Sequence, residues 1–318
     1  MEFVLLVLGL VLLIKAADYF VDASTSIARI FRVSEIIIGA TIVSIGTTLP
    51  ETMVSAVSAV KGHGDISYGN ALGSIICNTS LIAAISFLFS PGPVDKEAIK
   101  RPVYYFFGSY IVYVFFAFFF KGFNRLSGII LISIFALYVF STIKSATDGN
   151  SAGAKDECSS ESIIKPLLIL IASAIVIAFA SNLLVDNGII IARKFGMPES
   201  VIGITIIALG TSLPELTTAI TALVKGYSSL SIGNVIGANF LNIVNVTGIA
   251  ALLNPFKIPT SKTVFGINSS YIVDIPVAFI VMFIMTVPVL KSGKTSRWQG
   301  VVLVLIYICF IAFQYTTN

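Results

Sequence analysis

One segment of the sequence occurs twice, 164 residues apart. Residues 36–51 and 200–215 align without a gap and are identical at nine of 16 positions, and both copies end in Leu-Pro-Glu. The same register continues as far as Asn78, which is matched by Asn242. Self-similarity at one fixed spacing over this length indicates an internal duplication, so the chain is built from two related halves.

The composition shows what surrounds these halves. Apolar residues make up 56% of the 318 residues and charged residues 11%, against about 45–50% and about 25% in an average soluble domain. A soluble domain of this length still needs a polar surface, so these proportions argue against a soluble enzyme and predict a chain embedded in lipid. A bilayer takes about 20 apolar residues of helix. The predicted spans are residues 3–21, 36–60, 67–89, 102–120, 126–144, 164–186, 199–223, 230–253, 269–290 and 297–315.

The two halves are separated by a polar segment. Residues 147–162 are rich in Ser, Gly, Asp and Glu, which is typical of a flexible linker, here expected in the cytoplasm. The first repeat is therefore predicted over 1–146 and the second over 163–318. Because each holds five spans, an odd number, the second repeat enters the membrane in the opposite direction, as in transporters with inverted repeats.

Loop charges predict the orientation. With the N-terminus outside, the inner loops hold 12 Lys and Arg residues and the outer loops seven. Positive charge collects on the cytoplasmic side, so we expect a multi-pass protein of the cell membrane with both termini outside. The net charge of +4 is spread thinly, so membrane lipid and small ions are the expected partners. Nucleic acid, a cofactor and an obligate protein partner are not expected.

Two acidic residues lie in the middle of predicted spans. Glu51 and Glu215 end the two copies of the repeated segment, and a carboxylate at that depth costs several kcal/mol, so it indicates a functional site. Pro50 and Pro214 precede them, lack an N–H group, and are expected to open the backbone over 44–47 and 208–211. The predicted fold is an all-α integral membrane protein with ten transmembrane helices in two inverted five-helix repeats and broken helices two and seven at the centre.

Oxygen-bearing residues surround the two carboxylates in the sequence. Thr47 and Thr211 stand four residues before a Glu, on the same helix face, and Ser74 and Asn78 share a face of span three. Span eight repeats this with Asn242 but has Ala238 where span three has Ser74. Hard cations such as calcium and sodium bind sets of oxygen ligands like these.

Several of these features have a simpler reading. A proline in a membrane helix is often only a kink, although a kink does not need a repeated Glu beside it. Asn78 and Asn242 are equally suited to hydrogen bonds between helices, and Ser74 to close packing. Lys15 and Asp18 in span one fit a pair that extends to the membrane surface.

Two carboxylates that converge on one cavity repel each other unless cations or protons neutralise them. One divalent ion, or two or more monovalent ions, would do so, and competition between these loads would produce antiport. The residues alone also allow a cation channel, although inverted repeats with broken helices favour alternating access over a pore. A membrane scaffold that transports nothing is the remaining alternative.

The segments 46–51, 69–78, 210–215 and 233–242 resemble the two alpha repeats of the calcium:cation antiporter superfamily, most closely those of prokaryotic sodium/calcium exchangers. The resemblance covers all ten spans. It implies exchange of calcium for sodium, with spans one and six sliding as a gate. It also implies a calcium site formed by the carboxylates of Glu51 and Glu215 and the carbonyls of Thr47 and Thr211.

The resemblance further implies sodium sites on both sides of the calcium site. One would use Thr48, Ser74 and the Ser44 carbonyl, and the other Ser212 and the Ala208 carbonyl. Many relatives have Ser where this chain has Ala238, which removes one hydroxyl, so proton/calcium antiport stays open as an alternative. Potassium-dependent relatives have Asp where this chain has Asn242, which argues against potassium transport.

Overall fold

The computed structural model is helical over nearly all of the chain that it describes. The described residues are 1–31, 33–151, 162–196, 210, 212–260, 263–264 and 266–316. Among them, eight helices are long and apolar enough to cross a membrane, or nine if one bent helix pair is counted as a span. The seventh predicted span, 199–223, is described only in its second half. The order of the helices agrees with the ten predicted spans.

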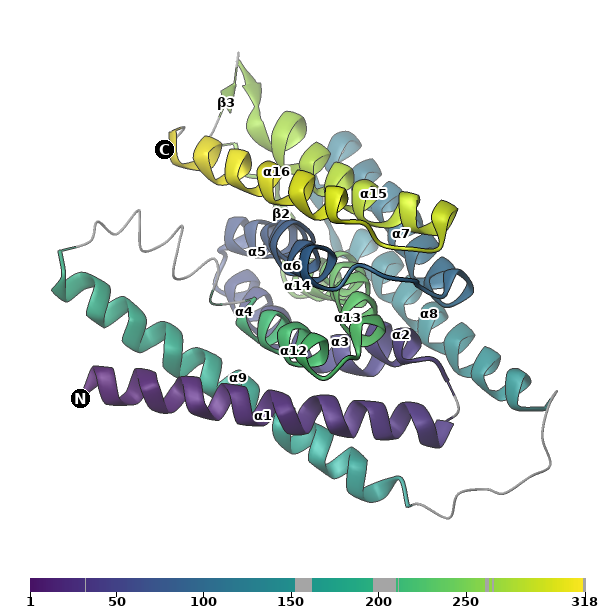
Figure 1. The fold of residues 1–318 in the computed structure, drawn as a ribbon. Helices are drawn as coiled ribbons and strands as arrows, with labels where there is room; N and C mark the ends of the chain where they lie inside the picture. The colour runs from purple at the N-terminus through teal and green to yellow at the C-terminus, as the bar shows by residue number, and fades with distance from the viewer. Residues whose placement is uncertain are drawn as a thin grey trace.

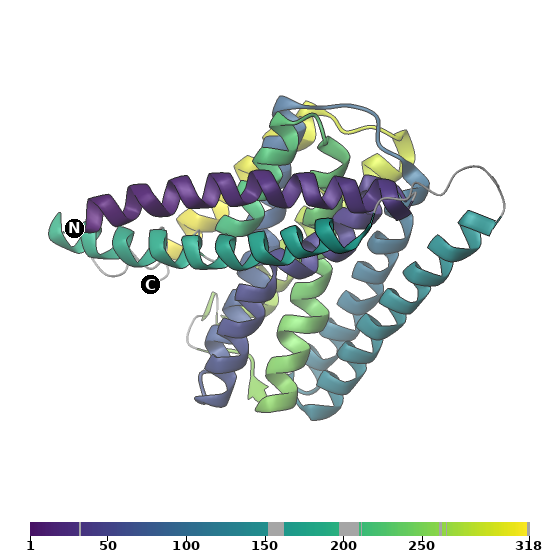
Figure 2. The same ribbon diagram turned by 90° about the horizontal axis from the view of Figure 1, so that it is seen from below.

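Two long helices lie side by side across one face of the bundle, at a steep angle to several of the others (Figures 1 and 2). They are α1 (Glu2–Phe31) and α9 (Ile164–Lys194), the first helix of each repeat. They run antiparallel, because Lys194 Nζ lies 3.1 Å from Glu2 Oε2 and a Cβ on Gly9 would lie 3.3 Å from the Ala180 carbonyl oxygen. This direction is the one that an inverted repeat requires.

Both helices are longer than the apolar runs 3–21 and 164–186 that predicted them. The parts of these helices beyond the apolar runs carry charged residues, which the membrane-length criterion excluded. In the structure some of these residues find partners on neighbouring elements, as Asp22 does with Lys225 and Lys194 with Glu2. The apolar length therefore marked where each helix begins but not where it ends.

The second span is broken as predicted. It consists of α2 (Glu35–Ile38), the π-helical turn η1 (Gly39–Val43), α3 (Ser44–Thr47) and α4 (Leu49–Val60), and it bends by 45° at Thr48. Pro50 cannot donate a hydrogen bond to the Gly46 carbonyl, so the helix is interrupted just before it. In the second repeat α12 (Leu213–Val224) begins at the matching position, with Pro214 in its first turn.

Spans three and eight carry the same irregularity in both halves. Span three is α5 (Gly64–Cys77), η2 (Asn78–Ala83) and α6 (Ala84–Phe89). Span eight is α13 (Ser228–Leu241), η4 (Asn242–Val246) and α14 (Thr247–Leu253). In each, a π-helical turn begins at the repeated asparagine. Such turns inside α-helices are frequent at functional sites.

The remaining helices cover the other side of the bundle (Figure 1). They are α7 (Lys96–Phe119), α8 (Arg125–Ser151), α15 (Ile275–Ser292), which follows the turn η5 (Ser270–Asp274), and α16 (Arg297–Thr316). The larger hydrophobic core lies between them and the inner spans, with Phe106, Tyr113 and Phe240 fully buried. A separate, smaller core around Leu13 and Phe20 joins α1 and α9 to the broken helix. The two long helices thus rest on a hydrophobic layer of their own.

The loops differ from the all-helical prediction in two small ways. Strand β1 (Gly122–Phe123) pairs antiparallel with β2 (Phe256–Lys257), and β3 (Thr263–Val264) pairs with β4 (Ile267–Asn268). These two-residue strands satisfy backbone groups in loops that no helix covers. Helix α8 also continues to Ser151, into the predicted linker 147–162, of which 152–161 lie outside the described residues. The division into repeats at this segment stays a prediction.

Glycines bring span eight against the broken second span. A Cβ added to Gly233 would lie 2.3 Å from the Ile36 carbonyl oxygen, and one added to Gly237 would lie 2.5 Å from Ser44 Oγ. The matching glycines of span three, Gly69 and Gly73, have no described atom within 4 Å. Their expected neighbours, 197–209, are outside the described residues. Close approach of the two inner spans is therefore observed for one repeat.

Candidate ion-binding site

The two carboxylates lie in the first turns of two half-helices, one from each repeat. Glu51 is the third residue of α4 and Glu215 the third of α12, and both side chains are completely buried. They are close enough to interact directly with each other. Within the described part of the chain, neither forms an ion pair with a lysine or arginine. Both carboxylates lie at helix N-termini, which favour negative charge.

Many polar atoms around the carboxylates are buried without a hydrogen-bond partner among the described residues. Those in predicted site residues are both oxygens of Glu51, Oε2 of Glu215, Oγ of Ser212, and the side-chain oxygen and nitrogen of both Asn78 and Asn242. An unsatisfied buried polar group costs about 1–3 kcal/mol, and a charged one more. Such a concentration of them is expected where a ligand or ordered water completes the set.

The inner spans bring these residues together across the two repeats. Helix α4 packs on the turn η4 that begins at Asn242, and α12 packs on the turn η2 that begins at Asn78. Thr48 Oγ1 donates a hydrogen bond to Glu215 Oε1 at 3.3 Å, which joins the break in span two directly to the carboxylate of span seven. Each repeat therefore supplies part of one shared site.

The Thr47 hydroxyl is engaged elsewhere. It donates to Asn234 Oδ1 at 3.2 Å, and Asn234 Nδ2 donates to Thr218 Oγ1 at 3.2 Å. This chain of bonds ties the broken helix of the first repeat to two helices of the second. The hydroxyl contributes to helix packing, and the family resemblance implies a ligand role for the Thr47 carbonyl.

The remaining predicted ligands are placed as follows. Ser44 is fully buried, its hydroxyl donates to the Thr41 carbonyl at 3.0 Å, and its own carbonyl accepts the Thr48 N–H at 2.9 Å. Ser74 is buried on α5, and Ala238, its counterpart, is buried on α13. Thr211 and Ala208 lie outside the described residues, so their part in the site stays a prediction.

Asn70 and Asn234, to which the sequence analysis assigned no role, form hydrogen bonds with residues of the two broken spans. Asn70 Nδ2 donates to the Glu51 carbonyl at 3.0 Å and to Ser55 Oγ at 2.9 Å. Asn234, its counterpart, holds Thr47 and Thr218. The Gly-Asn pair repeated in both halves was the available signal. The hydrogen bonds that these asparagines form depend on which helix lies next to them, and the sequence does not identify that helix.

Thr48 offers a selective test of the sodium site that the family resemblance implies. The variant Thr48→Val keeps the side-chain shape but removes the hydroxyl that reaches Glu215. Loss of one hydrogen bond to a charged group costs about 1.5–3 kcal/mol. We therefore expect the sodium concentration for half-maximal exchange to rise about tenfold or more, with a smaller change for calcium.

Ion titrations of exchange in liposomes measure this effect. Thr52→Val is the matched control, because the Thr52 hydroxyl donates to the Thr48 carbonyl within its own helix at 2.9 Å. A sodium dependence that is the same in Thr48→Val and Thr52→Val would remove Thr48 from the sodium site.

Comparison with known proteins identifies the family. The family described as "Sodium/calcium exchanger protein" matches residues 1–144 and 165–316, nearly the whole chain. The chain belongs to the sodium/calcium exchanger family. This member of the exchanger family is a multi-pass membrane transporter for cations and not an enzyme.

Relatives of this exchanger-family chain match over their full length. The sodium/calcium exchanger MaX1 of Methanosarcina acetivorans is 30% identical, and the alignment covers 98% of this chain and 97% of MaX1. The inner membrane protein YrbG of Escherichia coli is 33% identical over 98% of this chain and 96% of its own. Both repeats, including the Pro-Glu segments, therefore fall within the aligned regions.

A solved structure matches this exchanger-family fold as well. It is that of the sodium-calcium exchanger NCX_Mj soaked with 2.5 mM Na⁺ and 10 mM Sr²⁺, with a TM-score of 0.83 and 32% identity over 98% of both chains. The predicted fold, ten transmembrane helices in two inverted repeats with broken helices at the centre, is confirmed by this match and by the antiparallel first helices.

Proposed function

We propose that this chain exchanges calcium for sodium across the cell membrane by alternating access, with Glu51 and Glu215 as the shared charge centre. One observation carries the proposal. Two fully buried carboxylates, one from each inverted repeat, lie close to each other, and three of their four oxygens have no geometric hydrogen-bond partner in the part of the chain that the structure describes. Buried charges are otherwise paired or coordinated to metal ions.

The charge of the site accounts for exchange rather than one-way release. The empty site carries two negative charges in a medium of low dielectric constant, where their repulsion and desolvation are costly. One calcium ion, or at least two sodium ions, would neutralise both carboxylates. The loaded site can then pass through a closed intermediate that the empty site cannot reach easily, so one load must replace the other.

The ligand set fits hard cations. Around the carboxylates we assign calcium to the carbonyls of Thr47 and Thr211, and sodium to two flanking groups. These flanking groups are Thr48, Ser74 and the Ser44 carbonyl on one side, and Ser212 and the Ala208 carbonyl on the other. Oxygen ligands of this kind suit calcium and sodium. The structures of the similar exchanger NCX_Mj soaked with Na⁺ and Sr²⁺ and with Na⁺ and Ca²⁺ support this pair of ions.

The orientation follows the loop charges. We place both termini outside the cell, with α1 and α9 as the sliding gate that covers the inner spans from one side and then from the other. YrbG, described as an inner membrane protein, supports a location in the cell membrane. Asn242 replaces the acidic residue of potassium-dependent relatives, so potassium is not part of the proposed exchange.

A flux experiment in liposomes tests the driving ion. Purified protein is reconstituted with sodium inside, and uptake of radioactive calcium is followed after dilution into sodium-free buffer. We expect uptake that requires the outward sodium gradient and stops when sodium is equal on both sides. Protein-free liposomes and liposomes loaded with choline are the controls.

Three other outcomes would replace the proposal. Uptake driven by a pH gradient in sodium-free buffer would indicate proton/calcium antiport, which Ala238 leaves open because it removes a hydroxyl from one sodium group. Uptake driven only by membrane potential would indicate a channel. No uptake, together with no binding of calcium or sodium by calorimetry, would indicate a non-transporting membrane protein.

A further inference from the structure

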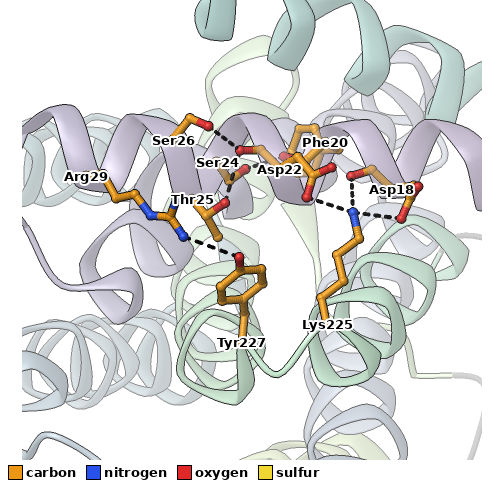
Figure 3. Close-up of polar contacts among 9 residues, drawn as sticks. All are labelled: Asp18, Phe20, Asp22, Ser24, Thr25, Ser26, Arg29, Lys225 and Tyr227. Atoms are coloured by element: carbon orange, nitrogen blue, oxygen red, sulfur yellow. Dashed lines mark hydrogen bonds and ion pairs between the residues drawn. The ribbon is translucent and has the colours of Figure 1, made fainter. Parts of the chain in front are cut away.

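A lysine at the end of α12 reaches across to α1 (Figure 3). Lys225 Nζ lies 2.7 Å from Asp18 Oδ1 and 2.7 Å from Asp22 Oδ1, and it donates to the Asp18 carbonyl at 2.9 Å. We call Lys225, Asp18 and Asp22 the Lys225 latch. It corrects the expectation that Asp18 pairs with Lys15. The latch joins a long outer helix to a half-helix that carries a site carboxylate.

Lys225 stays protonated over the physiological pH range. Burial alone would lower the pKa of Lys225, but the hydrogen bonds and charges of Asp18 and Asp22 outweigh it and raise that pKa above its usual value. A second contact lies beside it, where Arg29 Nη2 of α1 is 3.5 Å from the Tyr227 hydroxyl (Figure 3). Two polar contacts therefore hold the last part of α1 to the turn after α12.

The rest of the interface between α1 and α12 is loose. A cavity of about 760 Å³ lies beside the contact between the two helices, lined among others by Leu10 and Leu13 of α1 and by Thr217 and Thr221 of α12. Apolar packing across this cavity is incomplete, so it cannot fix the position of α1 tightly. Helices α1 and α9 pack along each other and are tied by Lys194 and Glu2, so they can move as one unit.

The inverted repeat supplies a second copy of the same parts. The 164-residue register matches Lys225 with Lys61, Asp22 with Asp186, and Asp18 with the neutral Asn182. Lys61 and Asp186 are both exposed, and among the described residues they form no ion pair. The sequence therefore contains the residues for a second latch, but in this structure Lys61 and Asp186 are not paired with each other.

The helix faces that lead to Lys61 and to Lys225 also differ, in how far the neighbouring outer helix covers them. On α4 the face that leads to Lys61 is uncovered, with Leu49 51%, Met53 61% and Val57 45% exposed. The matching face of α12, which leads to Lys225, lies beneath α1. Helix α1 packs along α12, whereas α9 does not pack along α4 to a similar extent. One half is covered by its outer helix and the other is not.

Building on the proposed alternating access, we propose that the Lys225 latch holds the gate helices over α12 in this state. In the opposite state, Lys61 and Asp186 form the reciprocal latch over α4. With the N-terminus outside, the Lys225 latch closes the cytoplasmic end, and the structure is the state open to the outside. The reciprocal latch has one carboxylate where the Lys225 latch has two. The outward-open state is therefore favoured when no ion gradient acts.

Distances between spin labels test the proposal without relying on transport. The distance between the exposed residues Tyr19 of α1 and Val224 of α12 measures the separation of the helices at the Lys225 latch. The distance between the exposed residues Ile190 of α9 and Val60 of α4 measures it at the reciprocal latch. Each pair is replaced by cysteine in a Cys158→Ser, Cys309→Ser background that keeps the buried Cys77. Double electron-electron resonance is recorded in lipid nanodiscs with sodium and without calcium.

Lys225→Gln is expected to lengthen the Tyr19–Val224 distance and shorten the Ile190–Val60 distance in part of the population. A partly exposed ion pair contributes about 0.2–1 kcal/mol, so the ratio of the two populations should shift by a factor of about 1.4 to 5 for each pair lost. Lys61→Gln should shift the ratio the other way. Asp22→Asn is a second variant of the latch, Lys225→Arg should restore the parent distances, and Lys257→Gln, at an exposed lysine in β2, is the control.

No change in either distance in Lys225→Gln and Asp22→Asn would overturn the latch, and so would a lengthening of both distances together. A change of the same sign in Lys61→Gln and Lys225→Gln would overturn the reciprocal part. A failure of sodium-driven calcium uptake in the parent protein would instead overturn the proposed function. The distances distinguish the two failures, because they are measured without any flux.

Discussion

Glu51→Gln and Glu215→Gln are each expected to reduce sodium-driven calcium uptake at least about 100-fold, which corresponds to about 2.7 kcal/mol. Each variant keeps the size of the side chain and removes one of the two charges that neutralise calcium. In a buried site of low dielectric constant, one ion–carboxylate attraction is worth at least that amount. Uptake of radioactive calcium into liposomes measures the loss.

Thermal unfolding separates this loss from misfolding. Neither carboxylate has a cationic protein partner within the described residues, so a neutral amide relieves repulsion, and both variants should melt at or above the parent's temperature in ion-free buffer. Calcium should raise the melting temperature of the parent but not of the variants. Glu97→Gln, at an exposed residue of α7 paired with Lys100, is the control. Parent-like uptake in both variants would refute the assignment.

Gly237→Ala is expected to destabilise the protein by about 1–3 kcal/mol. The added methyl group would lie 2.5 Å from Ser44 Oγ and 2.6 Å from the Ala40 Cα, and backbone cannot move aside easily. The Ala40 carbonyl also accepts a 2.8 Å hydrogen bond from the Tyr138 hydroxyl, which a shift of η1 would strain. We expect the melting temperature to fall by about 5 °C and the apparent affinity for sodium to weaken, because Ser44 moves.

Gly108→Ala is the matched control for this substitution. Gly108 lies within α7 with no described atom within 4 Å, so alanine should be neutral or slightly stabilising there. If Gly237→Ala and Gly108→Ala melt alike and transport alike, the close contact between η1 and α13 is not needed for the site.

The break in span two could be predicted because it is a local property. Pro50 lacks an N–H group wherever it stands, and a Glu one residue later in both halves indicates a site whatever the surrounding fold. The duplication then fixed the direction of the second repeat by counting spans. These inferences need no knowledge of which helices are neighbours.

The contacts between repeats could not be predicted in the same way. These contacts join residues that are far apart in the chain. They are the hydrogen bonds from Thr48 to Glu215 and from Thr47 to Asn234, and the ion pair of Asp18 with Lys225. Each depends on how far one helix is shifted along another, and apolar periodicity does not determine that shift. The nearest charge in sequence, Lys15, was therefore the wrong partner for Asp18.

The turns that begin at Asn78 and Asn242 let the two halves of a span pack against different helices. A π-helical turn adds a residue to the helix, so the side chains beyond it are rotated by about 100° relative to those of a continuous α-helix. Before the turn, α5 faces α4 and α13 faces the broken second span; beyond it, α6 packs on α16 and α14 packs on α8. Deleting one residue within η2 or η4 should therefore convert the wide turn to ordinary α-helix and keep the outer half of the span on its present neighbours.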